Sequence, residues 1–240
     1  MKILYIFPHP DDESFGPALG ISAQQRAGHE IYLLTLTKGG ATKQRHKLGL
    51  SVEEMGEVRY KEMLNVEKVL GLTGMTVLDL PDSGLKEMDL REIEKVVREE
   101  IKRIKPDILV TYPVHGISGF HDHLVQHAVV KRVYLQMRDE GADYLKRLAF
   151  FTLSEADAKK ANEDNIFHIN GSADDILDCA IDVTEEDKQK MKDGLLCYET
   201  YKETIEKTGI MDIQGDKTYY EFFQEDFKPM LDDITKNLKP

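Results

Sequence analysis

A short apolar run near the start of the chain ends abruptly in an imidazole and three carboxylates. Residues 2–7 (KILYIF) are mostly β-branched, aromatic or aliphatic, which is typical of a buried strand. Residues 8–13 read PHPDDE, and their two prolines disfavour helix at this point. We expect Ser14 or Glu13 to cap a helix that has Pro17 in its first turn. The histidine and acids therefore follow the carboxyl end of a strand, where open α/β sheets bind ligands.

Apolar strand-like runs alternate with amphipathic helical patterns along the first two thirds of the chain. The expected strands cover residues 2–7, 31–37, 76–80, 108–112 and 148–153. The expected helices cover residues 17–27, 51–70, 89–105 and 124–139. This alternation predicts an α/β fold with a Rossmann-like, doubly wound, mostly parallel sheet and helices on both faces. The first and fourth strands are neighbours in that order, so the loops that follow them should meet in one crevice.

The chain of 240 residues is expected to form a single domain. Residues 1–154 would be its α/β core, and residues 155–240 a less regular part of the same domain. Within that part we expect a polar loop over 155–175, a strand over 176–183 and a helix from Thr184 to about Tyr201. The tail from Gly209 onward has no clear pattern.

Charge and cysteine usage restrict the partners and the compartment. The net charge of −12 argues against nucleic acid and anionic membranes as main partners. Two isolated cysteines fit a reducing cytosol, and no run approaches the roughly 18 apolar residues of a membrane span. We therefore expect a cytoplasmic protein that acts on a small soluble molecule. The aromatic segment 219–227 (YYEFFQEDF) offers weak support for a homo-oligomer and could equally pack in the core.

Two clusters of imidazoles and carboxylates suit zinc or a similar divalent ion. The first follows the first strand, and the second follows the fourth strand around His121, Asp122, His123 and His127. A catalytic zinc needs three protein ligands and an open position for water. Two ligands from the first cluster and one from the second would satisfy this, and a spare carboxylate could take a proton from the water. The alternative is a set of solvated loop acids with a helix cap.

The same segments resemble a known enzyme family. Residues 8–13 resemble the HPDDE signature of the PIG-L/LmbE-like de-N-acetylases, which are zinc-dependent enzymes that remove acetyl groups from N-acetylglucosamine units. Arg59 to Glu62, with a Leu-Gly pair at 70–71, resembles the family's R-x-x-E…LG helix. Residues 81–84 are similar to its PDxG-type turn, and residues 105–107 with 116–123 resemble the segment that ends in GHPDH. The matching motifs run from residue 3 to about residue 130, and the resemblance is weak beyond residue 150.

The resemblance implies a role for each matching residue. His9, Asp12 and His123 would be the metal ligands, and Asp11 would be the general base that activates water. The implied reaction is attack of water on an acetamide carbonyl, which releases acetate and a free amine.

Arg59 and Asp82 fall where the family contacts its substrate. Each also has a simpler interpretation. Arg59 could form an ordinary helix salt bridge with Glu57 or Glu62, and Asp82 could be a turn acid.

The chain departs from the family pattern at one point. The family's GHPDH is GFHDH here, so Phe120 replaces a histidine that usually serves as an acid or oxyanion donor. Phenylalanine can neither donate nor accept a proton. His121 is therefore the candidate catalytic acid, and His115 in the same loop is a weaker candidate. His127 lies one helical turn beyond His123 and is expected to be a supporting or core histidine rather than a ligand.

The leading hypothesis is a zinc-dependent hydrolase that removes an acetyl group from an N-acetylglucosamine-type amino sugar or its small conjugate. One alternative is an amidohydrolase with a different N-acyl substrate, and another is a non-catalytic, metal-stabilised binding protein. A nucleotide-binding Rossmann domain is disfavoured, because no GxGxxG follows the first strand and its loop is acidic. The basic residues of segment 38–47 either attract an anionic group of the substrate or form a solvated loop.

Overall fold

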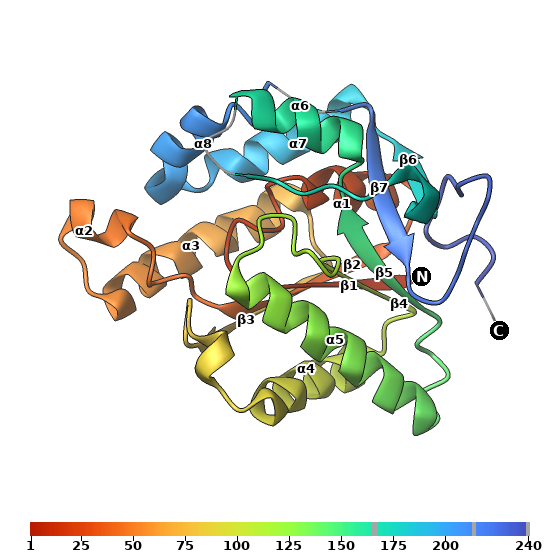
Figure 1. The fold of residues 1–240 in the computed structure, drawn as a ribbon. Coiled ribbons are helices and arrows are strands. Elements are labelled where there is room, and N and C mark those ends of the chain that lie inside the picture. Colours follow the sequence, from red (N-terminus) through yellow and green to blue (C-terminus); the bar gives the residue numbers. More distant parts are fainter. Residues whose placement is uncertain (165–167, 213–214, 239–240) are drawn as a thin grey trace.

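The computed structural model describes residues 1–164, 168–212 and 215–238, which form an α/β fold around one sheet (Figure 1). Its strand order is β3-β2-β1-β4-β5-β7-β6. The first five strands of that order run parallel, whereas β7 is antiparallel to both β5 and β6. The strands are β1 (Lys2–Phe7), β2 (Glu30–Thr37), β3 (Gly74–Leu80), β4 (Ile108–Thr111), β5 (Arg147–Thr152), β6 (Cys179–Asp182) and β7 (Lys217–Phe222). The predicted doubly wound, mostly parallel sheet is confirmed.

Helices cover both faces of the sheet. Figure 1 shows α1 (Pro17–Arg26), α3 (Val52–Leu70) and α7 (Glu185–Leu196) above the sheet, and α4 (Leu90–Ile104) and α5 (His121–Asp139) below it. Because side chains alternate across a strand, β1 contributes Tyr5 and Phe7 to the upper core and Leu4 and Ile6 to the lower core. Burial on both faces explains why this strand is apolar at nearly every position. No helix of the described residues is both long and apolar enough to cross a membrane.

Capping residues fix the ends of several helices. Ser51 caps α3 in a full capping box with Glu54, and Gly71 ends this helix in the left-handed conformation, at φ 66°. Thr184 and Asp187 form the same box at the start of α7. The expected cap of α1 was wrong. Gly16 occupies the cap position without a side-chain bond, because the Ser14 hydroxyl donates to the buried Glu13 carboxylate instead.

Several segments expected to be irregular are helical or extended. The basic segment 38–47, one interpretation of which was a solvated loop, overlaps α2 (Gln44–Leu48). The loop expected over 155–175 contains α6 (Glu155–Asp164), and 165–167 lie outside the described residues. The strand predicted over 176–183 is shorter, and a 3-10 turn (η2, Asp174–Ile176) precedes it.

Three further boundaries differ from the sequence-based expectations. The helix predicted to reach Tyr201 ends at Leu196 and is followed by a 3-10 turn (η3, Glu199–Tyr201) and α8 (Lys202–Thr208). The unassigned tail contains β7, which pairs with β5 and β6, while 213–214 lie outside the described residues. In addition, α5 begins at His121, so His123 lies in its first turn rather than in a loop.

A buried arginine fastens the chain that follows β7. The side chain of Arg147 is fully buried on β5 and forms a two-pronged salt bridge with Glu225, with both nitrogen–oxygen distances 2.8 Å. It also donates to the carbonyl oxygens of Ile234 and Lys236 and packs over the ring of Phe222. These contacts hold the C-terminal segment against the sheet.

Arg147→Met replaces the arginine with an unbranched apolar side chain and removes every one of these donors. We expect it to lower the free energy of unfolding by about 3–5 kcal/mol, because Glu225 would remain mostly buried without a counter-charge. Urea unfolding measures the change. The comparison variant is Arg98→Met, which breaks a more exposed pair with Glu140 and should cost no more than about 1 kcal/mol. Equal losses in the two variants would contradict the anchoring role.

Candidate functional site

The carboxyl ends of β1 and β4 bring the two predicted clusters together. The two strands pair directly, with Ile3 opposite Ile108 and Tyr5 opposite Val110. The loop after β1 therefore lies beside the first turn of α5, and His123 Nε2 is 3.3 Å from Asp12 Oδ1. The prediction that the loops after the first and fourth strands meet is confirmed.

Asp12 is the centre of this cluster. Its carboxylate accepts the backbone N–H of His9 (2.8 Å) and the hydroxyl of Tyr112 (2.8 Å). His9 Nδ1 lies 3.4 Å from Asp12 Oδ2, so both imidazoles face the same carboxylate. Burial disfavours the charge of Asp12, but the imidazoles of His123 and His9 outweigh it and hold the pKa of this carboxyl far below its usual range.

His9 is surrounded by carboxylates. Its Nε2 atom lies 3.1 Å from Asp122 Oδ2 and 3.4 Å from Asp82 Oδ1, on the side of the ring away from Asp12. Burial opposes a charge on this ring, yet hydrogen bonds to Asp12 and Asp122 and the charges of Asp12 and Asp82 raise the pKa of His9 to about 10. The cluster thus attracts positive charge strongly.

The His123 ring is held in one orientation. It stacks on Tyr112 with the ring centroids 4.4 Å apart and the planes 8° apart. Its Nδ1 atom lies 2.9 Å from the carbonyl oxygen of Gly116, a contact in which the ring nitrogen is the donor. This contact fixes the orientation of the ring and directs Nε2 toward Asp12, where this nitrogen could serve as a metal ligand.

Two overlapping sets of side chains could hold a metal ion. His9, Asp12 and His123 offer ligand atoms that all lie within 4.8 Å of one another, and so do His9, Asp82 and Asp122. Both sets need His9, whose Nδ1 faces Asp12 and whose Nε2 faces the other two acids. Two imidazoles with one carboxylate are the ligands that zinc prefers, so the first set fits that ion better.

Asp11 and Arg59 form a buried pair beside the cluster. Arg59 is 2% exposed, and its Nη2 atom donates to Asp11 Oδ2 (2.7 Å) and to the carbonyl of Pro10 (2.9 Å). Burial raises the pKa of Asp11 to about 6, although Arg59 opposes the shift. The proposed helix salt bridge of Arg59 was wrong. Glu57 pairs with Lys38 and Glu62 binds Thr200 instead.

The other predicted residues lie in different surroundings. Asp82 belongs to the cluster, because its Oδ1 lies 3.4 Å from His9 Nε2, while its Oδ2 accepts the backbone N–H of Ala41 (2.7 Å). His121 is exposed and makes no side-chain hydrogen bond with any described residue. His115 lies beside Ser172 (3.2 Å), and His127 is a core histidine whose Nδ1 lies 2.9 Å from the carbonyl of Tyr112. Phe120 is exposed, with its ring edge-on to His123.

The sequence-based reasoning missed three tyrosines of the site. Tyr112, which donates to Asp12, follows β4 and could have been found by its position at a strand end. Tyr198 and Tyr201 come from the C-terminal third. The Tyr198 hydroxyl bonds Asp11 and Glu13, and the Tyr201 ring lies 4.1 Å from the Arg59 guanidinium carbon. No local pattern links them to a loop more than 180 residues earlier.

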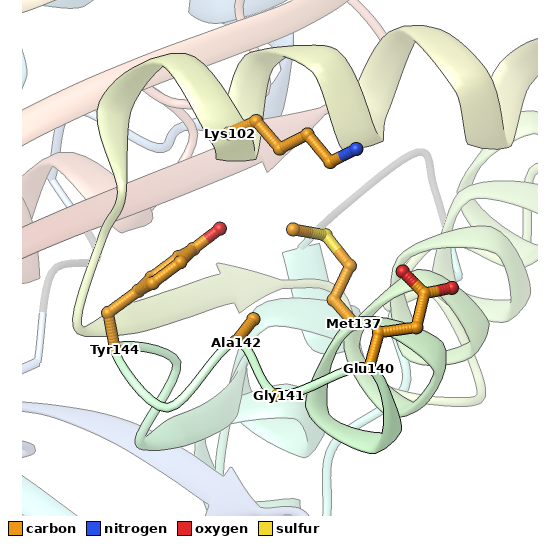
Figure 2. A pocket seen from close by; sticks show the side chains of 6 residues that line it. All are labelled: Lys102, Met137, Glu140, Gly141, Ala142 and Tyr144. Atoms are coloured by element: carbon orange, nitrogen blue, oxygen red, sulfur yellow. The ribbon is translucent and has the colours of Figure 1, made fainter.

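Two hollows on the described surface lie away from this cluster. The one drawn in Figure 2 has a volume of about 190 Å³ and lies between α4 and the loop that leads into β5. It is therefore at the amino-terminal edge of the parallel strands. The other, of about 240 Å³, lies between α1 and α7 around Arg26 and Asp187. Neither contains a predicted site residue.

The first half of the chain is similar to known proteins. The family model described as PIG-L, GlcNAc-PI de-N-acetylase, matches residues 4–134. A relative from Thermomonospora curvata, 1D-myo-inositol 2-acetamido-2-deoxy-alpha-D-glucopyranoside deacetylase, is 28% identical over 163 residues. That match covers 59% of this chain and 54% of the relative. The chain spans about half the length of several curated relatives that it matches.

Solved structures share the fold over nearly the whole chain. A deacetylase of the teicoplanin biosynthesis pathway superimposes with a TM-score of 0.71 at 14% identity, covering 94% of this chain and 99% of the other. The 4-carboxy-2-hydroxymuconate hydratase of Pseudomonas putida KT2440 has a TM-score of 0.67 at 13% identity, with 99% of both chains covered. At these identities the likeness establishes the fold alone, and the fold carries more than one chemistry.

Two glycines in the loop before α5 test how tightly His123 is held. Both have positive φ, 63° at Gly116 and 70° at Gly119, so alanine costs about 1–2 kcal/mol of backbone strain at either position. A Cβ at Gly116 would lie 2.9 Å from the Cβ of His123, whereas nothing lies within 4 Å at Gly119. We expect Gly116→Ala to destabilise the protein by about 1–3 kcal/mol more than Gly119→Ala in urea unfolding. Equal costs would show that His123 moves freely.

Proposed function

The chain belongs to the PIG-L family of GlcNAc-PI de-N-acetylases, and we propose that it is a zinc-dependent hydrolase that deacetylates an N-acetylglucosamine-type amino sugar or a small conjugate of one. The observation that carries this proposal is the convergence of His9, Asp12 and His123 at the end of β1, with Asp11 beside them. Another divalent metal could replace zinc in this role.

The residues around the cluster fit a divalent ion. Several carboxylates face His9, and Arg59, the guanidinium nearest to them, is already paired with Asp11. His9 Nδ1, Asp12 and His123 Nε2 would be the ligands, while Asp122 holds the other nitrogen of His9 and Gly116 that of His123. When bound, the ion would lower the pKa of a water molecule and polarise the acetamide carbonyl.

Asp11 has the properties required of a general base. Its side chain is 15% exposed and its carboxylate is fixed by Arg59, so it can accept a proton from water at a defined position. The water oxygen then forms a bond to the acetamide carbon, and the bond from that carbon to nitrogen breaks. The leaving nitrogen takes up a proton, which gives acetate and a free amine.

Asp82 is proposed to contact the sugar, and Arg59, which was expected to do the same, is proposed to orient Asp11 instead. One oxygen of Asp82 is bound to Ala41, and the other points toward His9, at the edge of the cluster where a sugar hydroxyl could donate to it. Arg59 is almost fully buried and bound to Asp11, so its orienting effect on the base is better supported than direct contact.

Two alternatives would place the same residues in other roles. The protein could hydrolyse a different N-acyl compound, since Phe120 changes the surroundings of His123. It could also bind metal and a ligand without catalysis. The buried pair of Asp11 and Arg59 favours an enzyme, because Asp11 belongs to neither candidate metal-ligand set.

The decisive experiment combines a metal assay with an activity assay. We expect about one zinc ion per chain in the wild type and in Asp11→Asn. Acetate release from N-acetylglucosamine and its simple conjugates should fall by about 10²–10⁴-fold in Asp11→Asn. Asp143→Asn, which changes an exposed aspartate in the loop before β5, is the matched control and should keep full activity. Bound zinc without acetate release from any conjugate would favour another substrate or a binding role, and no bound metal would refute the proposed site.

His121 is proposed to protonate the leaving nitrogen, since Phe120 cannot. We expect His121→Gln to lower kcat by about 10²-fold or more, as removal of a general acid does. His115→Gln should have little effect, because that ring is directed to Ser172. The reverse result would transfer the role to His115. Unchanged kcat in both variants would mean that neither histidine is the acid.

A further inference from the structure

Tyr198 connects the C-terminal third of the chain to the candidate site. It follows α7 directly, lies well beyond the residues matched by the family model, and is only 1% exposed. Its ring packs in the upper core, so only the hydroxyl group reaches the loop after β1.

The Tyr198 hydroxyl bonds the residues immediately before and after Asp12 in the sequence, Asp11 and Glu13. It accepts the backbone N–H of Asp11 (2.8 Å) and lies 2.8 Å from Glu13 Oε1, to which it donates. The sulfur of Met63 lies 2.7 Å away and is a second, weaker acceptor for the same proton. Glu13 is fully buried and also accepts the Ser14 hydroxyl (2.5 Å).

The backbone at Asp11 needs such a partner. Its φ of 85° lies in the left-handed region, which residues with a Cβ rarely adopt. Such a conformation persists only where the surroundings fix it. The Tyr198 hydroxyl gives the Asp11 N–H its hydrogen bond, and a buried N–H without one would favour a different backbone path.

Arg59 holds the other end of the same residue. Its guanidinium binds the Asp11 carboxylate and the carbonyl of Pro10, and the ring of Tyr201 covers it. Asp11 is therefore fixed at its backbone by Tyr198 and at its side chain by Arg59. Removal of either contact would allow the carboxylate to move.

We propose that Tyr198 is a positioning residue that holds Asp11 in the orientation needed for proton transfer. This inference rests on the proposed role of Asp11 as the general base. It assigns part of the catalytic geometry to the C-terminal third, outside the residues that carry the family motifs.

Tyr198→Phe tests the inference by removing only the hydroxyl. We expect kcat for acetate release to fall by about 10- to 100-fold, because a small displacement of a catalytic group has effects of this size. KM and the zinc content per chain should not change. Tyr220→Phe is the matched control, since it removes another fully buried hydroxyl, one bonded to Tyr5 and Gln24. It should leave kcat unchanged.

Glu13→Gln provides an independent variant should Tyr198→Phe fail to fold. It replaces the carboxyl group that accepts the Tyr198 proton with an amide, whose oxygen is a weaker acceptor, and we expect a fall in kcat with unchanged KM. Combining Tyr198→Phe with Asp11→Asn should lower kcat no further than Asp11→Asn alone, because the two changes act through one carboxylate.

The outcomes separate this inference from the proposed function. Full kcat in Tyr198→Phe, with activity lost in Asp11→Asn, would overturn the positioning role and leave the general base in place. A higher KM or a lower zinc content, with kcat unchanged, would make Tyr198 a structural residue only. Full activity in Asp11→Asn would refute the proposed function itself.

Discussion

The structure depends on the parallel pairing of β1 with β4 at the centre of the sheet. β1 is buried on both faces and bonded along both edges, to β2 and β4, so the chain cannot become polar until the strand ends. Its first polar side chain after the strand is His9, directly opposite the start of α5. This single pairing brings His9 and Asp12 to His123 across more than a hundred residues of sequence. The fold thereby creates the site.

Burial of so many acids is the second constraint. Asp12, Glu13 and Asp122 are each less than a tenth exposed, and isolated carboxylates are costly to bury. Hydrogen bonds from Tyr112, Tyr198 and backbone N–H groups offset part of that cost. The buried Arg59 offsets the charge of the neighbouring Asp11, and the proposed divalent ion would offset a further part. The same interactions that make these acids tolerable also fix their orientation.

Local signals identified most of the fold and half of the site. The helix expected over 51–70 and the apolar alternation depend on neighbouring residues, and the structure confirms both. The helix α6 was missed although Ser154 caps it through Asp157, because its sequence has few apolar residues. β7 was missed because a strand of mixed aromatic and polar residues is defined by its partners β5 and β6.

The sequence by itself determined the order of the elements, the family and the residue types that follow β1 and β4. These properties follow from short motifs, which depend on neighbouring residues and not on distant contacts. Only the tertiary structure decided that Arg59 pairs with Asp11 rather than with its helix neighbours, and that Tyr198 reaches Asp11. Each of these contacts joins residues far apart in the chain, and a linear pattern contains no information about which distant side chains share a space.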